Sequence, residues 1–104
     1  MNRAKVFTWK EFEELIEEIT YGTMNVGYDI SDGWFFTERY FDTDEEYNEW
    51  LKEYGEDVET EVNSFENKEE FVYCMIDRKF DAVLQSIIVD IYADAVAVIF
   101  KEED

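Results

Sequence analysis

The sequence predicts an α+β domain with a mainly antiparallel sheet of about five strands and three helices, in the order α-β-β-α-β-α-β-β. Three observations lead to this class. Two segments open with helix-capping motifs and continue with helical hydrophobic spacing, others alternate apolar with polar residues, and an Ile/Val-rich run lies near the C-terminus. Strands that follow one another directly favour antiparallel pairing. A chain of 104 residues suits one modest core, so residues 1–104 are expected to form a single domain.

The first helix is predicted over residues 8–20. Thr8 and Glu11 match a capping box, in which the Thr8 hydroxyl accepts the Glu11 N–H and the Glu11 carboxylate accepts the Thr8 N–H. Phe7 and Phe12 occupy the positions of a hydrophobic staple. Apolar residues then recur every three or four positions, which gives the helix one face for the core. These residues are Trp9, Phe12, Leu15, Ile16 and Ile19.

Residues 24–41 are predicted to form a β-hairpin. Apolar and polar residues alternate from Met24 to Ile30, which is typical of a half-buried strand. Gly33 can adopt the positive φ of a tight turn, and the run WFFTERYF that follows suits a partner strand. Its aromatic residues are interpreted either as covered by neighbouring elements or as an exposed anchor for a partner. They are Trp34, Phe35, Phe36, Tyr40 and Phe41.

The second helix is predicted to begin at a capping box from Thr43 to Glu46 and to end at Gly55. Its inner side is aromatic and aliphatic. A short strand is predicted next, because Val58, Thr60 and Val62 alternate with polar residues. The inner residues of the helix are Tyr47, Trp50, Leu51 and Tyr54, at positions i, i+3, i+4 and i+7.

The third helix is predicted from Asn67 to about Phe80, and two central strands follow it. The C-terminal run SIIVDIYADAVAVIFKEED is rich in Ile and Val, which favours strands over one long helix. A reversal is expected at Ala93 and Asp94, although neither glycine nor asparagine stands there.

The composition argues against several functions. The chain has 28 acidic residues, 9 basic residues and no histidine, for a net charge of −19. Direct binding to nucleic acid or to an anionic membrane is disfavoured, because both need basic side chains. Cys74 is the single cysteine and lies in an apolar run, so a buried, inert thiol is expected in a reducing cytoplasm. Without histidine the usual general base is missing, and the protein is interpreted as not an enzyme, with no cofactor.

A metal site and a membrane segment are not expected either. Acidic residues from Asp42 to Glu53 fall at the ligand positions of a calcium loop, but Tyr47 stands where that loop needs glycine for its bend. The same residues fit a capped helix better. No apolar run reaches the roughly 18 residues that cross a bilayer, and the N-terminus lacks the apolar stretch of a secretory signal.

The acidic segment from residue 42 to residue 62 is the candidate binding site. Carboxylates at this density match the phosphate spacing of one DNA strand and suit the arginine contacts of a nucleic-acid-binding groove. The alternative is a solvated face that keeps the protein soluble, but its like-charged i,i+4 pairs are destabilising and solubility does not require them. The candidate residues are Asp42, Asp44, Glu45, Glu46, Glu49, Glu53, Glu56, Asp57, Glu59 and Glu61.

In its small size, acidity and dense acidic helix, the chain resembles the DNA-mimic inhibitors that phages and mobile elements carry against restriction and CRISPR nucleases. The resemblance covers composition and includes no shared motif. It implies a protein that blocks the basic DNA or RNA groove of a host defence nuclease in the cytoplasm. Two alternatives stay open: an immunity protein that neutralises a basic toxin nuclease through an aromatic anchor, and an adaptor that binds a protein through residues 34–41. The oligomeric state is not predicted.

Overall fold

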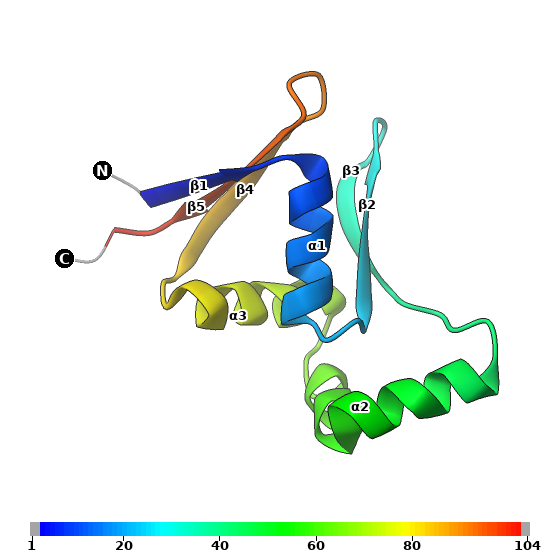
Figure 1. The fold of residues 1–104 in the computed structure, drawn as a ribbon. Helices are drawn as coiled ribbons and strands as arrows, with labels where there is room; N and C mark the ends of the chain where they lie inside the picture. The colour runs from blue at the N-terminus through cyan, green and yellow to red at the C-terminus, as the bar shows by residue number, and fades with distance from the viewer. Residues whose placement is uncertain (1–2, 103–104) are drawn as a thin grey trace.

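The structure is a computed structural model that describes residues 3–102. Within this range it contains three helices and five antiparallel strands, in the order β-α-β-β-α-α-β-β (Figure 1). The predicted α+β class is confirmed, as are the numbers of helices and strands. Two features differ from the prediction: the strands form two separate sheets, and the element order changes because one strand was missed and one predicted strand is helical.

The larger sheet has the order β1-β5-β4 and joins the two ends of the chain. Strand β1 (Arg3–Phe7), which the sequence analysis missed, pairs with β5 (Ala95–Phe100), and β5 also pairs with β4 (Leu84–Asp90). The reversal between β4 and β5 falls where it was predicted. Asp94 supplies the left-handed residue with a φ of 50°, so the turn needs no glycine.

The second sheet is the predicted hairpin of β2 (Met24–Asp29) and β3 (Gly33–Glu38). Gly33 adopts a φ of 87° in the turn, which a glycine tolerates without strain. Gly27 faces Phe35 across the two strands, and a Cβ at Gly27 would lie 2.9 Å from the Phe35 ring. A glycine is therefore required at Gly27 for the ring to lie flat over the opposite strand.

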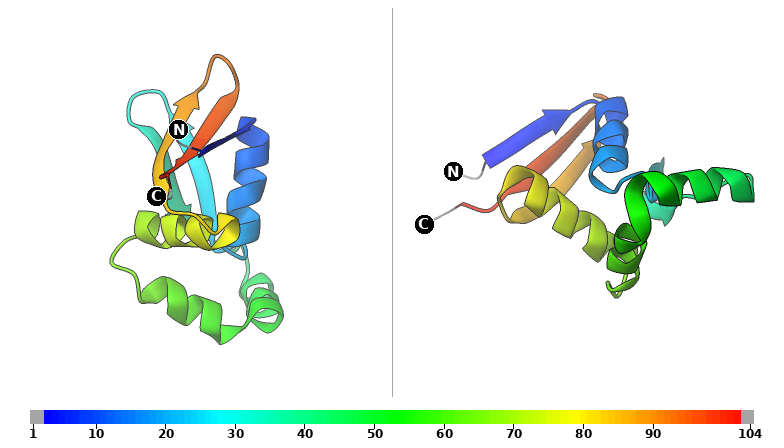
Figure 2. Two further views of the ribbon diagram at one scale, coloured as in Figure 1. Left: turned by 90° about the vertical axis from the view of Figure 1, so that its left-hand side faces the viewer. Right: turned by 60° about the horizontal axis from the view of Figure 1, so that its bottom comes forward.

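The core lies between the two sheets and the helices α1 (Trp9–Ile19) and α3 (Lys68–Phe80) (Figures 1 and 2). Both helices begin where they were predicted. The capping box of α1 is complete, since the Glu11 N–H donates to Thr8 Oγ1 at 3.1 Å and the Thr8 N–H donates to Glu11 Oε1 at 2.8 Å. Cys74 of α3 is only half-buried, which corrects the expectation of a buried thiol.

Helix α2 (Asp44–Asn63) runs well past its predicted end at Gly55. The chain bends at Gly55, which has a φ of 81° and a ψ of 164°, and a second helical segment follows. The strand predicted over residues 58–62 was therefore wrong. Val58 and Val62 alternate with polar residues, but they are also four positions apart, so the same pattern fits one face of a helix. The helical alternative is the one the structure adopts.

Helix α2 projects from the rest of the molecule. It is the green helix at the bottom of Figure 1, and Figure 2 shows its two segments meeting at an angle. None of its described side chains is fully buried, in contrast to α1 and α3. None of the helices in residues 3–102 has both the length and the hydrophobicity needed to cross a bilayer.

Candidate protein-interaction surface

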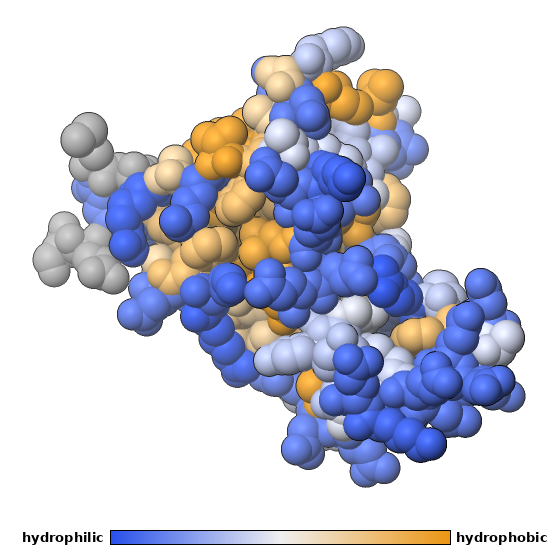
Figure 3. Space-filling model, in the orientation of Figure 1, coloured by the Kyte–Doolittle hydropathy of each residue, from blue (hydrophilic) through white to orange (hydrophobic). Residues whose placement is uncertain are grey.

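The exposed acids of α2 and of the residues just before it form one candidate surface, which we call the acidic face. Figure 3 shows the hydrophilic surface over α2 at the lower right. Eight of the ten predicted site residues are exposed there. Seven of the eight side chains make no hydrogen bond or ion pair within residues 3–102; the exception is Glu46. The eight residues are Asp42, Asp44, Glu45, Glu46, Glu49, Glu53, Glu56 and Asp57.

The other two predicted residues, Glu59 and Glu61, are half-buried and bind other parts of this protein. The Tyr47 hydroxyl donates to Glu59 Oε1 at 2.7 Å and links the two segments of α2 across the bend at Gly55. The guanidinium of Arg78 on α3 pairs with the Glu61 carboxylate and ties the second segment to the body. These two acids hold α2 in place, so they are not part of the acidic face.

Each of these contacts raises the pKa of the residue that binds the carboxylate, Tyr47 in one case and Arg78 in the other. The hydrogen bond to Glu59 raises the pKa of Tyr47 above its ordinary value, and loss of solvent and the charge of Glu59 add to the shift. The hydrogen bond to Glu61 raises the pKa of the Arg78 guanidinium. The carboxylates therefore favour a protonated Tyr47 and a charged Arg78, which keeps both contacts intact at neutral pH.

Trp50 anchors the first segment of α2 to the body. Its indole Nε1–H donates to the Tyr21 carbonyl at 2.6 Å, just after α1 ends. Gly22 lies beside this contact and has a φ of 77°, a conformation that glycine adopts without strain. The Trp50 ring also contacts Tyr54 and Phe41, with centroids 6.0 and 5.8 Å apart. An aromatic cluster therefore holds the inner side of α2 and leaves its acids in solvent.

The start of α2 is capped less regularly than predicted. The Glu46 N–H donates to Thr43 Oγ1 at 3.2 Å, as in a capping box. The carboxylate of Glu46 does not return to Thr43, however. Its Oε2 accepts the N–H of Asp42 at 3.2 Å, so it orders the residue ahead of the cap. Asp42 is thereby held next to the start of the helix and extends the acidic face beyond it.

The spacing of the acidic face can be compared with that of a nucleic acid. Because of the bend at Gly55, the straight part of α2 is limited to residues 44–54. This segment spans about 16 Å at a rise of about 1.5 Å per residue. It carries five acids, roughly one for every 3 Å of axis, compared with one phosphate per about 3.4 Å in a DNA strand. The similar charge spacing therefore holds for the straight segment.

The aromatic run at residues 34–41 does not form a single exposed patch. Trp34 and Phe36 point inward and contact Tyr73 on α3, whereas Phe41 packs against Trp50. Phe35 and Tyr40 are the exceptions, because Phe35 is 41% exposed and Tyr40 is 83% exposed. Tyr40 is the one next to the acidic face. It lines a shallow depression with several acids of the acidic face, including Asp42, Glu46 and Glu49. An aromatic side chain thus lies beside the carboxylates, as its sequence position two residues before Asp42 indicates.

Known proteins add no assignment to this geometry: no protein-family model, no curated protein and no solved structure matches the chain. Among residues 3–102, no group of three or more acidic or cysteine side chains is arranged to hold a metal ion. Exposed carboxylates can accept hydrogen bonds from lysine and arginine side chains, so the acidic face has the chemistry that suits a basic surface.

Proposed function

We propose that the protein mimics nucleic acid and inhibits a nucleic-acid-handling protein by occupying its basic groove with the acidic face. The observation that supports this most is the contrast between the two sides of α2. Its aromatic side binds the body, and the carboxylates of its acidic face are exposed. Apart from Glu46, they make no hydrogen bond or ion pair within residues 3–102. A helix selected only to stabilise the fold gains nothing from this arrangement, because like charges on neighbouring turns repel one another.

The resemblance to DNA-mimic inhibitors extends the proposal to a target class. We propose that the groove belongs to a host defence nuclease of the restriction or CRISPR type, and that the complex forms in the cytoplasm. The carboxylates occupy the positions of phosphates, and arginine side chains of the groove donate to them in pairs. The inhibitor performs no chemistry itself; it acts by excluding the natural substrate.

Immobilised protein incubated with bacterial lysate tests the proposal. Basic, nucleic-acid-binding proteins are expected to be retained at low salt, to elute at high salt, and to be displaced by duplex DNA or by guide RNA. The salt dependence follows from the screening of exposed charges. Mass spectrometry identifies the retained proteins, and a cleavage assay on each nuclease measures inhibition. Retention that is insensitive to both salt and nucleic acid contradicts the proposal.

Two variants of equal charge separate the acidic face from the overall charge. The first, Glu46→Gln with Glu49→Gln and Glu53→Gln, removes three carboxylates from α2. The second, Glu13→Gln with Asp32→Asn and Asp81→Asn, removes three exposed carboxylates from other elements. The first variant should bind more than about tenfold more weakly, because each charge-assisted hydrogen bond contributes 1 kcal/mol or more. Equal losses in both variants would mean that only net charge matters.

Tyr40 supports a second candidate function, an immunity protein that neutralises a toxin nuclease. Its exposed ring beside Asp42 and Glu46 combines an aromatic anchor with carboxylates, and tyrosine is enriched at binding hot spots. For this function, Tyr40→Ala should weaken binding more than the triple change on α2 does. For the nucleic-acid mimic, the order of the two effects should be reversed.

A further inference from the structure

A pocket of about 320 Å³ lies near the β4–β5 turn, the start of α1 and strand β2. In Figure 1 this turn and the tip of the β2–β3 hairpin are at the top of the molecule, whereas α2 is at the bottom. The pocket is therefore separate from the acidic face. Its volume falls within the range of sites that bind small groups, and its walls are mainly apolar.

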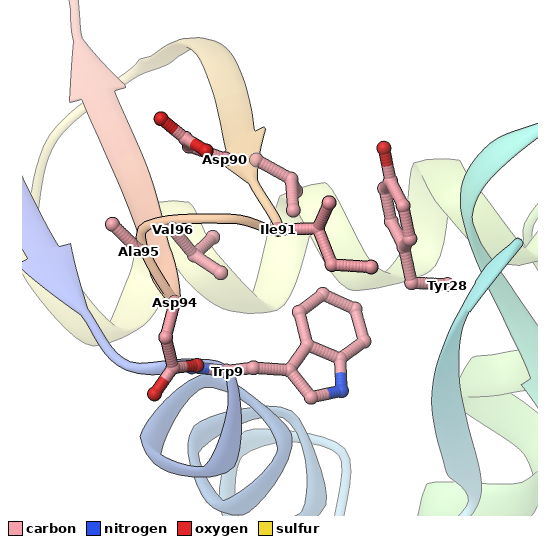
Figure 4. Close-up of a pocket in the computed structure, with 8 residues that line it drawn as sticks. Trp9, Tyr28, Asp90, Ile91, Asp94, Ala95 and Val96 are labelled. Atoms are coloured by element: carbon pink, nitrogen blue, oxygen red, sulfur yellow. The ribbon is translucent and has the colours of Figure 1, made fainter. Parts of the chain in front are cut away.

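Two aromatic rings form the walls of this pocket. Figure 4 shows the indole of Trp9 face-on, with the ring of Tyr28 to one side and the side chain of Ile91 between them. The two ring centroids are 5.9 Å apart at an angle of 73°. Neither the indole N–H of Trp9 nor the hydroxyl of Tyr28 makes a hydrogen bond within residues 3–102. The pocket thus has an accessible aromatic face and two unused donors.

A carboxylate lies at the rim of the pocket beside Trp9. Asp94 Oδ1 accepts the backbone N–H of Trp9 at 3.1 Å, which fixes the side chain at the start of α1, and its second oxygen accepts no hydrogen bond within residues 3–102. Asp90 also lines the pocket and is fixed by the N–H groups of Tyr92 and Ala93, each at 3.1 Å. The rim therefore carries negative charge on side chains whose positions are set by the backbone.

Hydrophobic side chains are exposed near the opening. Figure 3 shows orange patches between blue residues at the top of the molecule, where Figure 1 places the β4–β5 turn and the tip of the hairpin. Two large side chains are strongly exposed there: Ile30 is 80% exposed and Tyr92 is 97% exposed. Apolar side chains exposed at a pocket opening are a feature of protein-binding sites. These exposed side chains around the pocket favour a protein partner over a single small molecule.

We propose that this pocket binds an arginine side chain presented by a peptide segment of a protein partner. The guanidinium stacks on the indole of Trp9 and donates to the free oxygen of Asp94, since arginine combines cation–π stacking with carboxylate binding. The peptide backbone next to the arginine offers carbonyl oxygens to the unused donors of Trp9 and Tyr28. Ile30 and Tyr92 contact the flanking residues of the peptide.

An arginine peptide matches each group of the pocket, whereas simpler ligands leave some unmatched. A purely apolar group leaves the Asp94 carboxylate without a cation. A simple amine has no acceptor for the indole N–H or the Tyr28 hydroxyl. An anionic ligand is repelled by Asp90 and Asp94. This proposal does not depend on the function proposed for α2, because it involves none of the residues of the acidic face.

Titration with N-acetyl-L-arginine N-methylamide tests the proposal, followed by the indole ¹H–¹⁵N resonances of the full-length protein at constant ionic strength. The Trp9 signal is assigned with Trp9→Phe. The expected result is a saturable shift of the Trp9 resonance at probe concentrations up to about 20 mM, the weak range in which so small a ligand binds. The Trp34 and Trp50 resonances should stay in place.

Matched probes and variants isolate the role of charge. The citrulline analogue of the probe has the same shape without the cation, and it should bind at least about tenfold more weakly. Asp94→Asn should cause a similar loss while keeping the fold, because asparagine tolerates the left-handed conformation and still accepts the Trp9 N–H. Asp57→Asn on α2, at the opposite end of the molecule, removes the same charge and should leave binding unchanged.

Three results would overturn the proposal: no saturable shift of Trp9, equal binding of the citrulline analogue, or unchanged binding by Asp94→Asn. The triple Gln variant of α2 should bind the probe as the unmodified protein does. If the probe does not bind the pocket, the function proposed for the acidic face is unaffected. If the lysate experiment contradicts that function, the arginine site proposed for the pocket is unaffected.

Discussion

Helices α1 and α2 begin in the same way but have different roles in the fold. Each starts after a threonine whose hydroxyl accepts the N–H of a glutamate three residues later. Helix α1 then buries four side chains, whereas α2 buries none. The comparison shows that capping and hydrophobic spacing specify where a helix begins. They do not specify whether the helix joins the core.

The inner residues explain the difference. Helix α1 turns Phe12 and aliphatic side chains inward, and these pack fully away from water. The inner side of α2 includes Tyr47, Trp50 and Tyr54, which are half-buried or exposed; aromatic residues of this kind carry a polar atom that needs a hydrogen-bond partner. The charges differ as well, since Glu17 and Glu18 of α1 pair with Arg39 and Lys79. Within residues 3–102, the acids of the acidic face form no ion pair with a base.

Replacing the central core residue of α1 should give the largest effect. Phe12 is fully buried, so Phe12→Ala should lower the free energy of unfolding by about 3–5 kcal/mol, through lost burial and the cavity left behind. Glu49→Ala, on the exposed side of α2, should change it by less than about 0.5 kcal/mol. Urea denaturation measures both. Similar losses in the two variants would refute the distinction between the helices.

Removal of the anchor of α2 should release that helix without unfolding the body. Trp50→Ala deletes the hydrogen bond to Tyr21 and the ring contacts with Phe41 and Tyr54. Amide hydrogen exchange should become faster throughout residues 44–54 and stay unchanged in α1, because an isolated helix of this length is marginal in water. Equal acceleration in both helices would show that they unfold as one unit.

The two threonine caps offer a smaller, matched test. Thr8→Ala should lower the free energy of global unfolding by about 1 kcal/mol, since α1 is part of the core. Thr43→Ala removes the same kind of bond, yet its effect should be confined to faster exchange at the start of α2. Denaturation and exchange measurements on both variants check this. A global loss from Thr43→Ala equal to that from Thr8→Ala would contradict it.

The smallest effect concerns pH and the bend in α2. Glu59 raises the pKa of Tyr47 above 10.0, so the folded protein holds this proton more tightly than the unfolded chain. The resulting stability is present below pH 10 and is lost as the pH rises through the folded-state pKa. Tyr47→Phe has no proton to lose, so the part of the fall in stability at high pH that comes from Tyr47 should disappear. Exchange of residues 56–63 measured between pH 8 and 11 in both proteins checks the difference, after correction for intrinsic rates.

Much of the fold follows from local patterns in the sequence. The cap of α1, the turn at Gly33, the start of α3 and the reversal at Asp94 all depend on residues close together in the chain. Strand β1 could not be identified in this way, because its five residues become a strand only by pairing with β5 at the other end of the chain. The segment from Val58 to Val62 fits both periods, and no local signal decides between them.

The candidate site shows the same division. Sequence alone determined the density of carboxylates from Asp42 to Asp57, because charge and helical spacing are properties of neighbouring residues. Only the tertiary structure decided that Glu59 and Glu61 bind Tyr47 and Arg78. It also brought Trp9, Tyr28 and Asp94 from three separate elements into one pocket. Such contacts depend on how the elements pack, which the order of residues along the chain does not show.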